Sequence, residues 1–86
     1  NWAVILSKQA VKDLKQIKQA GLGKKTKVLL EALQDDPFVT PPRYESLVGN
    51  LKGFYSRRIN IKHRLVYAVD IDAQVIHILR CWTHYE

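Results

Sequence analysis

Four arginines in the second half of this 86-residue chain are its most promising chemical groups. They are Arg57, Arg58, Arg64 and Arg80. A guanidinium presents a planar fork of donors that fits two phosphate oxygens, so arginines gathered on one surface are typical of a phosphate site. The alternative is that each arginine pairs with a nearby carboxylate on a solvated sheet surface.

Aromatic side chains lie close to these arginines in the sequence, namely Phe54, Tyr55, Trp82 and Tyr85. Aromatic rings beside a basic groove suit the stacking of RNA bases, although most rings in a small domain pack in its core. A histidine side chain ordinarily titrates near neutral pH, so His84 is a candidate for proton transfer, whereas we expect His63 and His77 to be structural. One cysteine and three dispersed histidines predict neither a metal site nor a cofactor.

The charge of the chain favours a polyanionic partner. Fourteen lysines and arginines outnumber eight acids, and the surplus lies in residues 1–34 and 43–64. Nucleic acid, an acidic protein or a membrane surface would each satisfy such a surplus. No apolar run approaches the roughly 18 residues that a membrane span needs. A single cysteine suits a reducing compartment, so we expect a cytoplasmic protein without membrane association.

The hydrophobic pattern predicts a single α+β domain over residues 1–86, with the element order β-α-α-β-β-β. The apolar run Trp2–Leu6 predicts a buried strand. Apolar side chains at helical spacing predict two helices in a hairpin, the first capped by Ser7 and the second stopped by Pro37. Three antiparallel strands follow, at Phe54–Asn60, Arg64–Asp70 and Gln74–Trp82. We expect a small, mainly antiparallel sheet with the helical hairpin packed on one face.

The alternation of side chains along these strands predicts which of them face the helices. Three-residue loops at Asn60–Lys62 and Ile71–Ala73 would place Arg64 opposite both Arg58 and Arg80. The positions expected under the helices are Tyr55, Arg57, Ile59, Leu65, Tyr67, Val69, Val75, His77, Leu79 and Cys81. The positions expected on the open face are Phe54, Ser56, Arg58, Asn60, Arg64, Val66, Ala68, Ile76, Ile78, Arg80, Trp82 and His84.

Several segments together resemble a known family of bacterial toxins. They are Tyr44–Leu47 (YESL), Asn50–Ile59 (NLKGFYSRRI), His63–Tyr67 (HRLVY) and the pair His84-Tyr85. In order and spacing they are similar to the YoeB/Txe toxins of the RelE/ParE toxin–antitoxin superfamily, and the similarity extends over nearly the whole chain. The resemblance implies a RelE-like fold and a ribosome-dependent endoribonuclease that cuts mRNA and so inhibits translation.

The resemblance also assigns roles to individual residues. Glu45 matches the base that deprotonates the ribose 2′-OH, Arg64 the cation that stabilises the phosphorane, and His84 the acid that protonates the leaving oxygen. Metal-free attack of the 2′-OH would leave a 2′,3′-cyclic phosphate and a 5′-OH. The residues expected to bind the substrate are Arg58, Tyr85, Lys52 and Arg57. A lysine common in the family soon after the glutamate is Val48 in this chain, so Lys52 or Lys62 would have to supply its contact.

The implied partners are mRNA on the ribosome and an acidic antitoxin of the YefM/Phd or RelB type, in a homodimer or a toxin–antitoxin hetero-oligomer. Two other functions fit parts of the pattern. One is a non-catalytic inhibitor of DNA gyrase like the ParE toxins, which share the fold, and the other is a basic RNA-binding module. The joint presence of Glu45, Arg64 and His84 favours the nuclease, because a protein that only binds has no use for a base, a cation and an acid.

Overall fold

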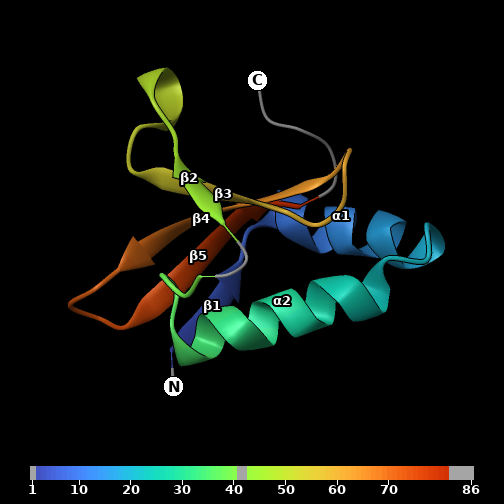
Figure 1. Cartoon of the computed structure of the whole chain (residues 1–86), viewed down its shortest axis with the longest axis horizontal. Helices are drawn as coiled ribbons and strands as arrows, with labels where there is room; N and C mark the ends of the chain where they lie inside the picture. The colour runs from blue at the N-terminus through green and yellow to red at the C-terminus, as the bar shows by residue number, and fades with distance from the viewer. Residues whose placement is uncertain (1, 41–42, 82–86) are drawn as a thin grey trace.

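A computed structural model describes residues 2–40 and 43–81 of the chain. Two helices lie on the same side of one five-stranded sheet, and the connection after the second strand projects away from them (Figure 1). The elements are β1 (Ala3–Leu6), α1 (Lys8–Gln19), α2 (Gly23–Asp35), β2 (Tyr44–Ser46), a 3₁₀ turn (Gly49–Leu51), β3 (Phe54–Arg58), β4 (Arg64–Asp70) and β5 (Val75–Arg80). The predicted α+β class and helical hairpin are confirmed.

The strand order is β1-β5-β4-β3-β2, so the first and last strands of the chain are neighbours. β1 runs parallel to β5, and all other pairs are antiparallel. The tight turns between β3, β4 and β5 require antiparallel pairing, whereas the helical hairpin between β1 and the rest of the sheet permits a parallel contact. β2 is a short edge strand that the sequence pattern did not predict.

The helix ends follow the predicted signals. The Ser7 side chain accepts a hydrogen bond from the Ala10 amide at 3.0 Å and so caps α1. Gly21 takes a positive φ of 79° directly after this helix, a conformation that glycine adopts without steric cost. α2 ends at Asp35, ahead of Pro37, which cannot donate to a continuing helix. None of the helices found in residues 2–40 and 43–81 is both long and apolar enough to cross a membrane.

The core lies between the helices and the sheet. Ile17 of α1 and Leu33 of α2 are fully buried, as are Leu65 and Tyr67 of β4 and Ile76 of β5. Complete burial of an aliphatic side chain contributes roughly 1.5–3 kcal/mol, so this layer supplies most of what holds the sheet against the helices.

The predicted side-chain pattern is correct for β3 and β4 but wrong for most of β5. Arg58 does pair with Arg64, as the three-residue loop required. The next turn is one residue longer than expected, since Asp70 pairs with Val75 and Gln74 takes a positive φ of 55°. This single extra residue exchanges the two faces of the sheet to which the β5 side chains point. Ile76 and Ile78 are therefore buried beside the β4 core residues, while His77, expected under the helices, is exposed.

A β-bulge near the end of β5 restores the expected facing of the last side chains of the strand. Tyr67 pairs with Ile78 but its neighbour Val66 pairs with Arg80, so Leu79 is the extra residue. Arg80 thereby returns to the face that carries Val66, as predicted, although Arg64 is not its partner. Cys81 is buried, also as predicted. The prediction that the first strand is buried is also wrong. β1 lies at the edge of the sheet, and its Ile5 is 51% exposed.

Candidate active site

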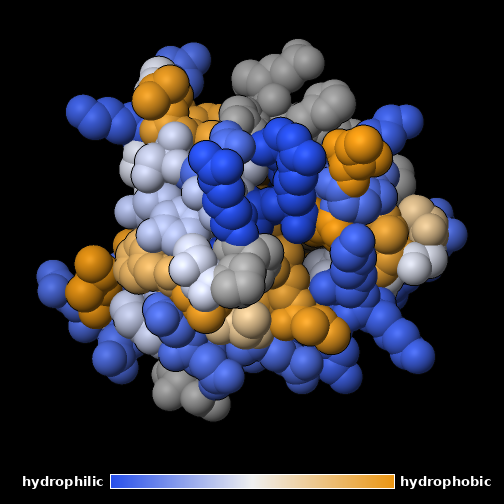
Figure 2. All heavy atoms as spheres, in the orientation of Figure 1, coloured by the Kyte–Doolittle hydropathy of each residue, from blue (hydrophilic) through white to orange (hydrophobic). Residues whose placement is uncertain are grey.

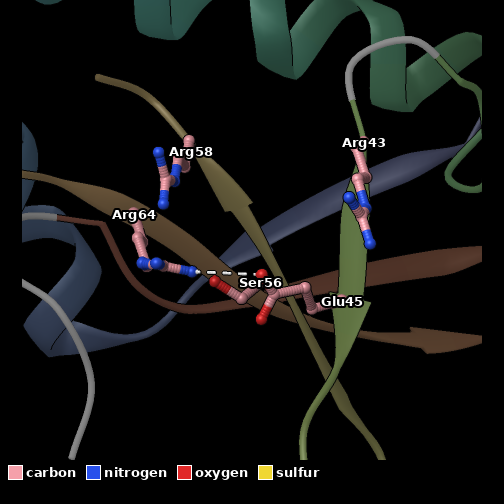
Figure 3. A pocket seen from close by; sticks show the side chains of 5 residues that line it. All are labelled: Arg43, Glu45, Ser56, Arg58 and Arg64. Carbon is pink, nitrogen blue, oxygen red and sulfur yellow. Dashed lines mark ion pairs between the residues drawn. The ribbon is translucent and has the colours of Figure 1, made fainter. Parts of the chain in front are cut away.

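A pocket of about 440 Å³ lies on the sheet where β2, β3 and β4 adjoin. Its lining residues are Arg43, Glu45, Ser56, Arg58 and Arg64. In Figure 3, Arg58 and Arg64 approach Glu45 and Ser56 from one side, and Arg43 lies on the other. Three guanidinium groups around one carboxylate leave the pocket positively charged, which suits the anionic backbone of RNA.

The register of three strands brings these residues together. Glu45 pairs with Ser56 across β2 and β3, and Arg58 pairs with Arg64 across β3 and β4. Directly paired residues point to the same face, and the next residue on that face lies two positions along the strand. Ser56 and Arg58 therefore lie side by side in the pocket, although Glu45 and Arg64 are far apart in the sequence.

The turn before Arg64 is fixed by a side chain. The Asn60 Oδ1 atom accepts hydrogen bonds from the backbone amides of Lys62 at 2.9 Å and His63 at 2.7 Å. The Ile59 amide donates to the His63 carbonyl at 2.9 Å and closes the same turn. This hydrogen bonding defines where β4 begins, and Arg64 is its first residue.

Glu45 and Arg64 form an ion pair across the pocket. Nη1 of Arg64 is 3.8 Å from Oε1 of Glu45, and the two side chains are 21% and 54% exposed. At this distance and exposure the pair contributes at most about 1 kcal/mol. Separation of this pair alone therefore costs little free energy.

Arg57 does not join this pocket. Its side chain, 1% exposed, points to the opposite face, where Nε donates to the Tyr67 hydroxyl at 2.8 Å and Nη2 to the Pro37 carbonyl at 3.1 Å. Its guanidinium carbon also lies 4.8 Å from the centre of the Tyr44 ring. Burial raises the pKa of Tyr67 above its usual 10.0, against the opposing effect of the Arg57 hydrogen bond. The tyrosine thus stays protonated, and it donates to the Pro37 carbonyl at 3.3 Å.

The other predicted site residues lie elsewhere. Lys52 is exposed in the connection between β2 and β3 and does not line the pocket. Arg80 shares the sheet face of Val66 but is likewise not a lining residue. His84 and Tyr85, the expected acid and stacking residue, lie outside the described residues.

Arg43 lines the pocket although its sequence context did not predict it, and Ser56 lies on the open face, as predicted, but had no predicted role. Both residues belong to the pocket because β2, a strand that was not predicted, places Glu45 opposite Ser56 and follows directly after Arg43. Arg43 stands two positions before Glu45, so an extended conformation through this segment puts them on one face.

A second, smaller hollow adjoins the pocket on the side of α2. It encloses about 200 Å³, and its lining residues are Lys25, Val28, Leu29, Ala32, Arg58 and Ile59. Figure 2 shows strongly hydrophilic side chains in the middle of the view around a hollow, with apolar side chains below it toward α2. Arg58 lines both depressions, so a partner that covered both would meet charge and apolar surface together.

One family model and several sequence relatives identify the family of this chain. The model of the YoeB-like toxins of bacterial type II toxin–antitoxin systems matches residues 6–85. The YoeB toxin of Synechocystis is 41% identical over 63 residues, which are 73% of this chain and 71% of that protein. The YoeB toxin of Escherichia coli K12 is 44% identical over 62 residues, which are 72% and 71% of the two chains.

A solved structure has the same fold. It is the heterotetrameric YoeB–YefM toxin–antitoxin complex from Staphylococcus aureus, whose matched chain is 38% identical to this one. The match has a TM-score of 0.81 and covers 99% of each chain.

Proposed function

The chain belongs to the YoeB-like toxins of bacterial type II toxin–antitoxin systems and is thus a ribonuclease toxin that cuts mRNA, and we propose that the pocket around Glu45 and Arg64 is where it cuts. The observation that carries this proposal is the placement of one carboxylate within 3.8 Å of a guanidinium, with two further arginines lining the same pocket. Cleavage of RNA by its own 2′-OH is accelerated by a base that takes the hydroxyl proton and by a cation that stabilises the charge on the phosphate.

In the proposed reaction, the Glu45 carboxylate takes the proton of the ribose 2′-OH. The 2′-oxygen forms a bond to the adjacent phosphorus, and the bond from phosphorus to the 5′-oxygen breaks. His84 gives a proton to that departing oxygen. The products are a 2′,3′-cyclic phosphate and a 5′-OH end, and neither the base step nor the acid step needs a metal ion. Each proton transfer contributes roughly 10²–10⁴-fold in rate.

Arg64 and Arg58 supply the electrostatic part of the reaction. Negative charge accumulates on the non-bridging oxygens as the phosphorane forms, and guanidinium groups already in place stabilise it without reorganisation. The Arg64 guanidinium lies 3.8 Å from Glu45, and it can turn from this carboxylate toward a phosphate bound in the same pocket. Tyr85 is proposed to stack on a base, and Lys52 to bind the RNA beyond the pocket.

The substrate is proposed to be mRNA held on the ribosome in the bacterial cytoplasm. The pocket supplies charge on one side of a sheet, and it therefore grips phosphate rather than enclosing a base. A ribosome would hold the single strand in a defined conformation, which replaces the positioning that a closed active site would give.

The proposed inhibitor is an acidic antitoxin. The Staphylococcus aureus relative was solved as a heterotetramer with the antitoxin YefM. In this chain an acidic segment with apolar side chains would fit the basic pocket and the hollow beside α2, which share Arg58. Binding there would occupy the phosphate site and so prevent cleavage.

A single-turnover assay with purified ribosomes and a 5′-labelled mRNA tests the nuclease site. We expect Glu45→Gln to slow cleavage by roughly 10²–10⁴-fold. Arg64→Met should lose about 3–4 kcal/mol of transition-state stabilisation, the loss typical of a charge-stabilising donor. Lys24→Ala, a charge removed from the exposed surface of α2, is the matched control. Cleavage by both pocket variants at the control rate would refute the proposed site.

The chemistry of the ends tests the proposed mechanism separately. The upstream fragment should carry a 2′,3′-cyclic phosphate, and an mRNA with one 2′-deoxyribose at the cut position should stay intact. Cleavage of that substrate would exclude attack by the 2′-OH. Inhibition of DNA gyrase by the purified protein, with mRNA left intact, would instead support the gyrase-inhibitor function.

A further inference from the structure

The floor of the pocket carries a polar group whose role the proposed mechanism leaves open. Ser56 is 1% exposed, and it lines the pocket together with Glu45, Arg58 and Arg64. Within residues 2–40 and 43–81, its hydroxyl oxygen is buried and has no hydrogen-bond partner. A buried hydroxyl without a partner destabilises a fold relative to an alanine, because it has lost its hydrogen bonds to water.

The neighbours of Ser56 indicate what this hydroxyl can bind. Ser56 is the direct cross-strand partner of Glu45. Directly opposed residues have Cβ atoms about 4.5–5.5 Å apart, so a small shift of the glutamate side chain brings its carboxylate within reach of the serine. In Figure 3 the serine lies next to the end of the Glu45 side chain, on the side from which Arg64 approaches.

In this structure the Glu45 carboxylate is directed toward Arg64 rather than bonded to the serine. One Glu45 oxygen faces Arg64 at 3.8 Å. When Arg64 turns to the RNA phosphate, the carboxylate loses the cation that oriented it. It then needs another donor to hold it at the angle required for taking the 2′-OH proton.

We propose that Ser56 is a positioning residue, whose hydroxyl donates a hydrogen bond to the Glu45 carboxylate once Arg64 has moved to the phosphate. This inference rests on the proposed role of Glu45 as the base. The hydroxyl is too deeply buried to meet RNA directly, so it acts through the carboxylate. The hydroxyl lacks a hydrogen bond in the free toxin because its acceptor, the Glu45 carboxylate, becomes available only in the RNA-bound state.

The first test is Ser56→Ala, which removes only the hydroxyl. We expect kcat for mRNA cleavage on ribosomes to fall by about tenfold or more, the effect of losing a hydrogen bond to a charged group. KM should remain close to that of the unchanged protein, because substrate binding is not touched. The melting temperature should stay the same or rise. A purely structural serine would give the opposite pattern, with a lower melting temperature and an unchanged kcat.

A second pair of variants removes the influence of side-chain size. Ser56→Thr and Ser56→Val have nearly equal volume, and only threonine keeps the hydroxyl. We expect the threonine variant to cleave about tenfold faster than the valine variant. If neither folds, the serine and alanine proteins decide the question alone.

The Glu45→Gln background separates failure of this inference from failure of the proposed site. If Glu45 is the base and Ser56 acts through it, adding Ser56→Ala to Glu45→Gln should cause little further loss. An equal loss in both backgrounds, or an unchanged kcat in the single variant, would overturn the role of Ser56. An active Glu45→Gln protein would instead overturn the base itself.

Discussion

Arg43 and Arg58 bring positive charge to the pocket from opposite sides of Glu45 (Figure 3). Their positions indicate different roles. Arg58 stands beside Arg64 in the paired register of β3 and β4, close to the proposed reaction. Arg43 lies beyond Glu45, outside β2, and is exposed. We therefore assign Arg43 to the grip on a neighbouring phosphate rather than to the transition state.

Replacement of Arg43 should weaken binding and leave the chemistry intact. For Arg43→Ala we expect a higher KM, an almost unchanged kcat, and a salt dependence of binding whose slope falls by about 1. Titration of labelled mRNA–ribosome complexes at several salt concentrations measures this slope. Lys27→Ala on the exposed surface of α2 is the control for simple loss of charge. A large fall in kcat for Arg43→Ala would instead place this arginine in the reaction.

At the scale of elements, the position of Glu45 depends on a three-residue edge strand. β2 pairs only with β3, and a strand this short is weakly held by its own ladder. The Tyr44 ring, on the face opposite Glu45, compensates for this. It packs against Phe38 and Tyr55 with ring centres 6.1 and 5.7 Å away, and it lies over the buried Arg57 guanidinium. This aromatic cluster therefore holds the strand that carries the proposed base.

Loss of the Tyr44 ring should loosen β2. Tyr44→Leu is expected to lower the free energy of unfolding by about 1–2 kcal/mol, since aromatic pairs and cation–π contacts each contribute roughly 0.5–1.5 kcal/mol. Amide hydrogen exchange in β2 should accelerate more than in β4, and mRNA cleavage should slow. Tyr44→Phe keeps the ring and is the matched control. Equal exchange rates in the two variants would show that the ring does not hold this strand.

At the scale of the whole molecule, the segment from Ser7 into α1 is bonded to the end of β5, so early and late parts of the chain are held together. The Ser7 hydroxyl, besides capping α1, donates to the Leu79 carbonyl at 2.6 Å. The buried Asp13 carboxylate accepts a hydrogen bond from the Cys81 amide at 3.1 Å. Burial, aided by the nearby Asp13 charge, raises the pKa of the Cys81 thiol from its usual 9.0 to about 12.

This thiol gives the stability of the molecule a defined response to high pH. Above pH 9 the unfolded chain loses the thiol proton while the folded protein keeps it, so the free energy of unfolding should fall as pH rises toward 12. The contribution of Cys81 is fully present below pH 9 and decreases by up to about 1.4 kcal/mol per pH unit above it.

Urea unfolding between pH 7 and 11 measures this slope. Cys81→Ala should show a smaller decrease over the same range, and the part that remains includes Tyr67, whose raised pKa acts with the same sign. Identical slopes for the two proteins would contradict the assignment. The native thiol should also resist iodoacetamide at pH 8 and react once the chain is unfolded.

Most of the fold could be predicted, because hydrophobic period, caps and short turns are local signals. The position of Arg58 opposite Arg64 followed from such a turn and is confirmed. The inversion of β5 could not be foreseen, since it depends on one residue in the turn after Asp70 and on a bulge at Leu79. Neither a four-residue turn ending in Gln74 nor a bulge has a sequence signal of its own. The error at His77 is the direct result.

The pocket was partly predictable for a related reason. The assignment of Glu45 came from family resemblance, and the structure places its carboxylate beside Arg64. Arg43 was missed because β2 is too short to produce a readable alternation. The alternation of side chains along β3 predicted Arg57 under the helices, whereas the expected substrate-binding residues also included it. Its contacts with Tyr67 and Tyr44 agree with the first expectation.

The parallel contact of β1 with β5 also determines when a newly made molecule can become complete. Ser7 and Leu79 are hydrogen-bonded although 72 positions separate them. During translation β1 therefore leaves the exit tunnel long before β5 and stays unpaired in the meantime. A nascent chain therefore cannot complete this sheet until β5 has left the ribosome and paired with β1.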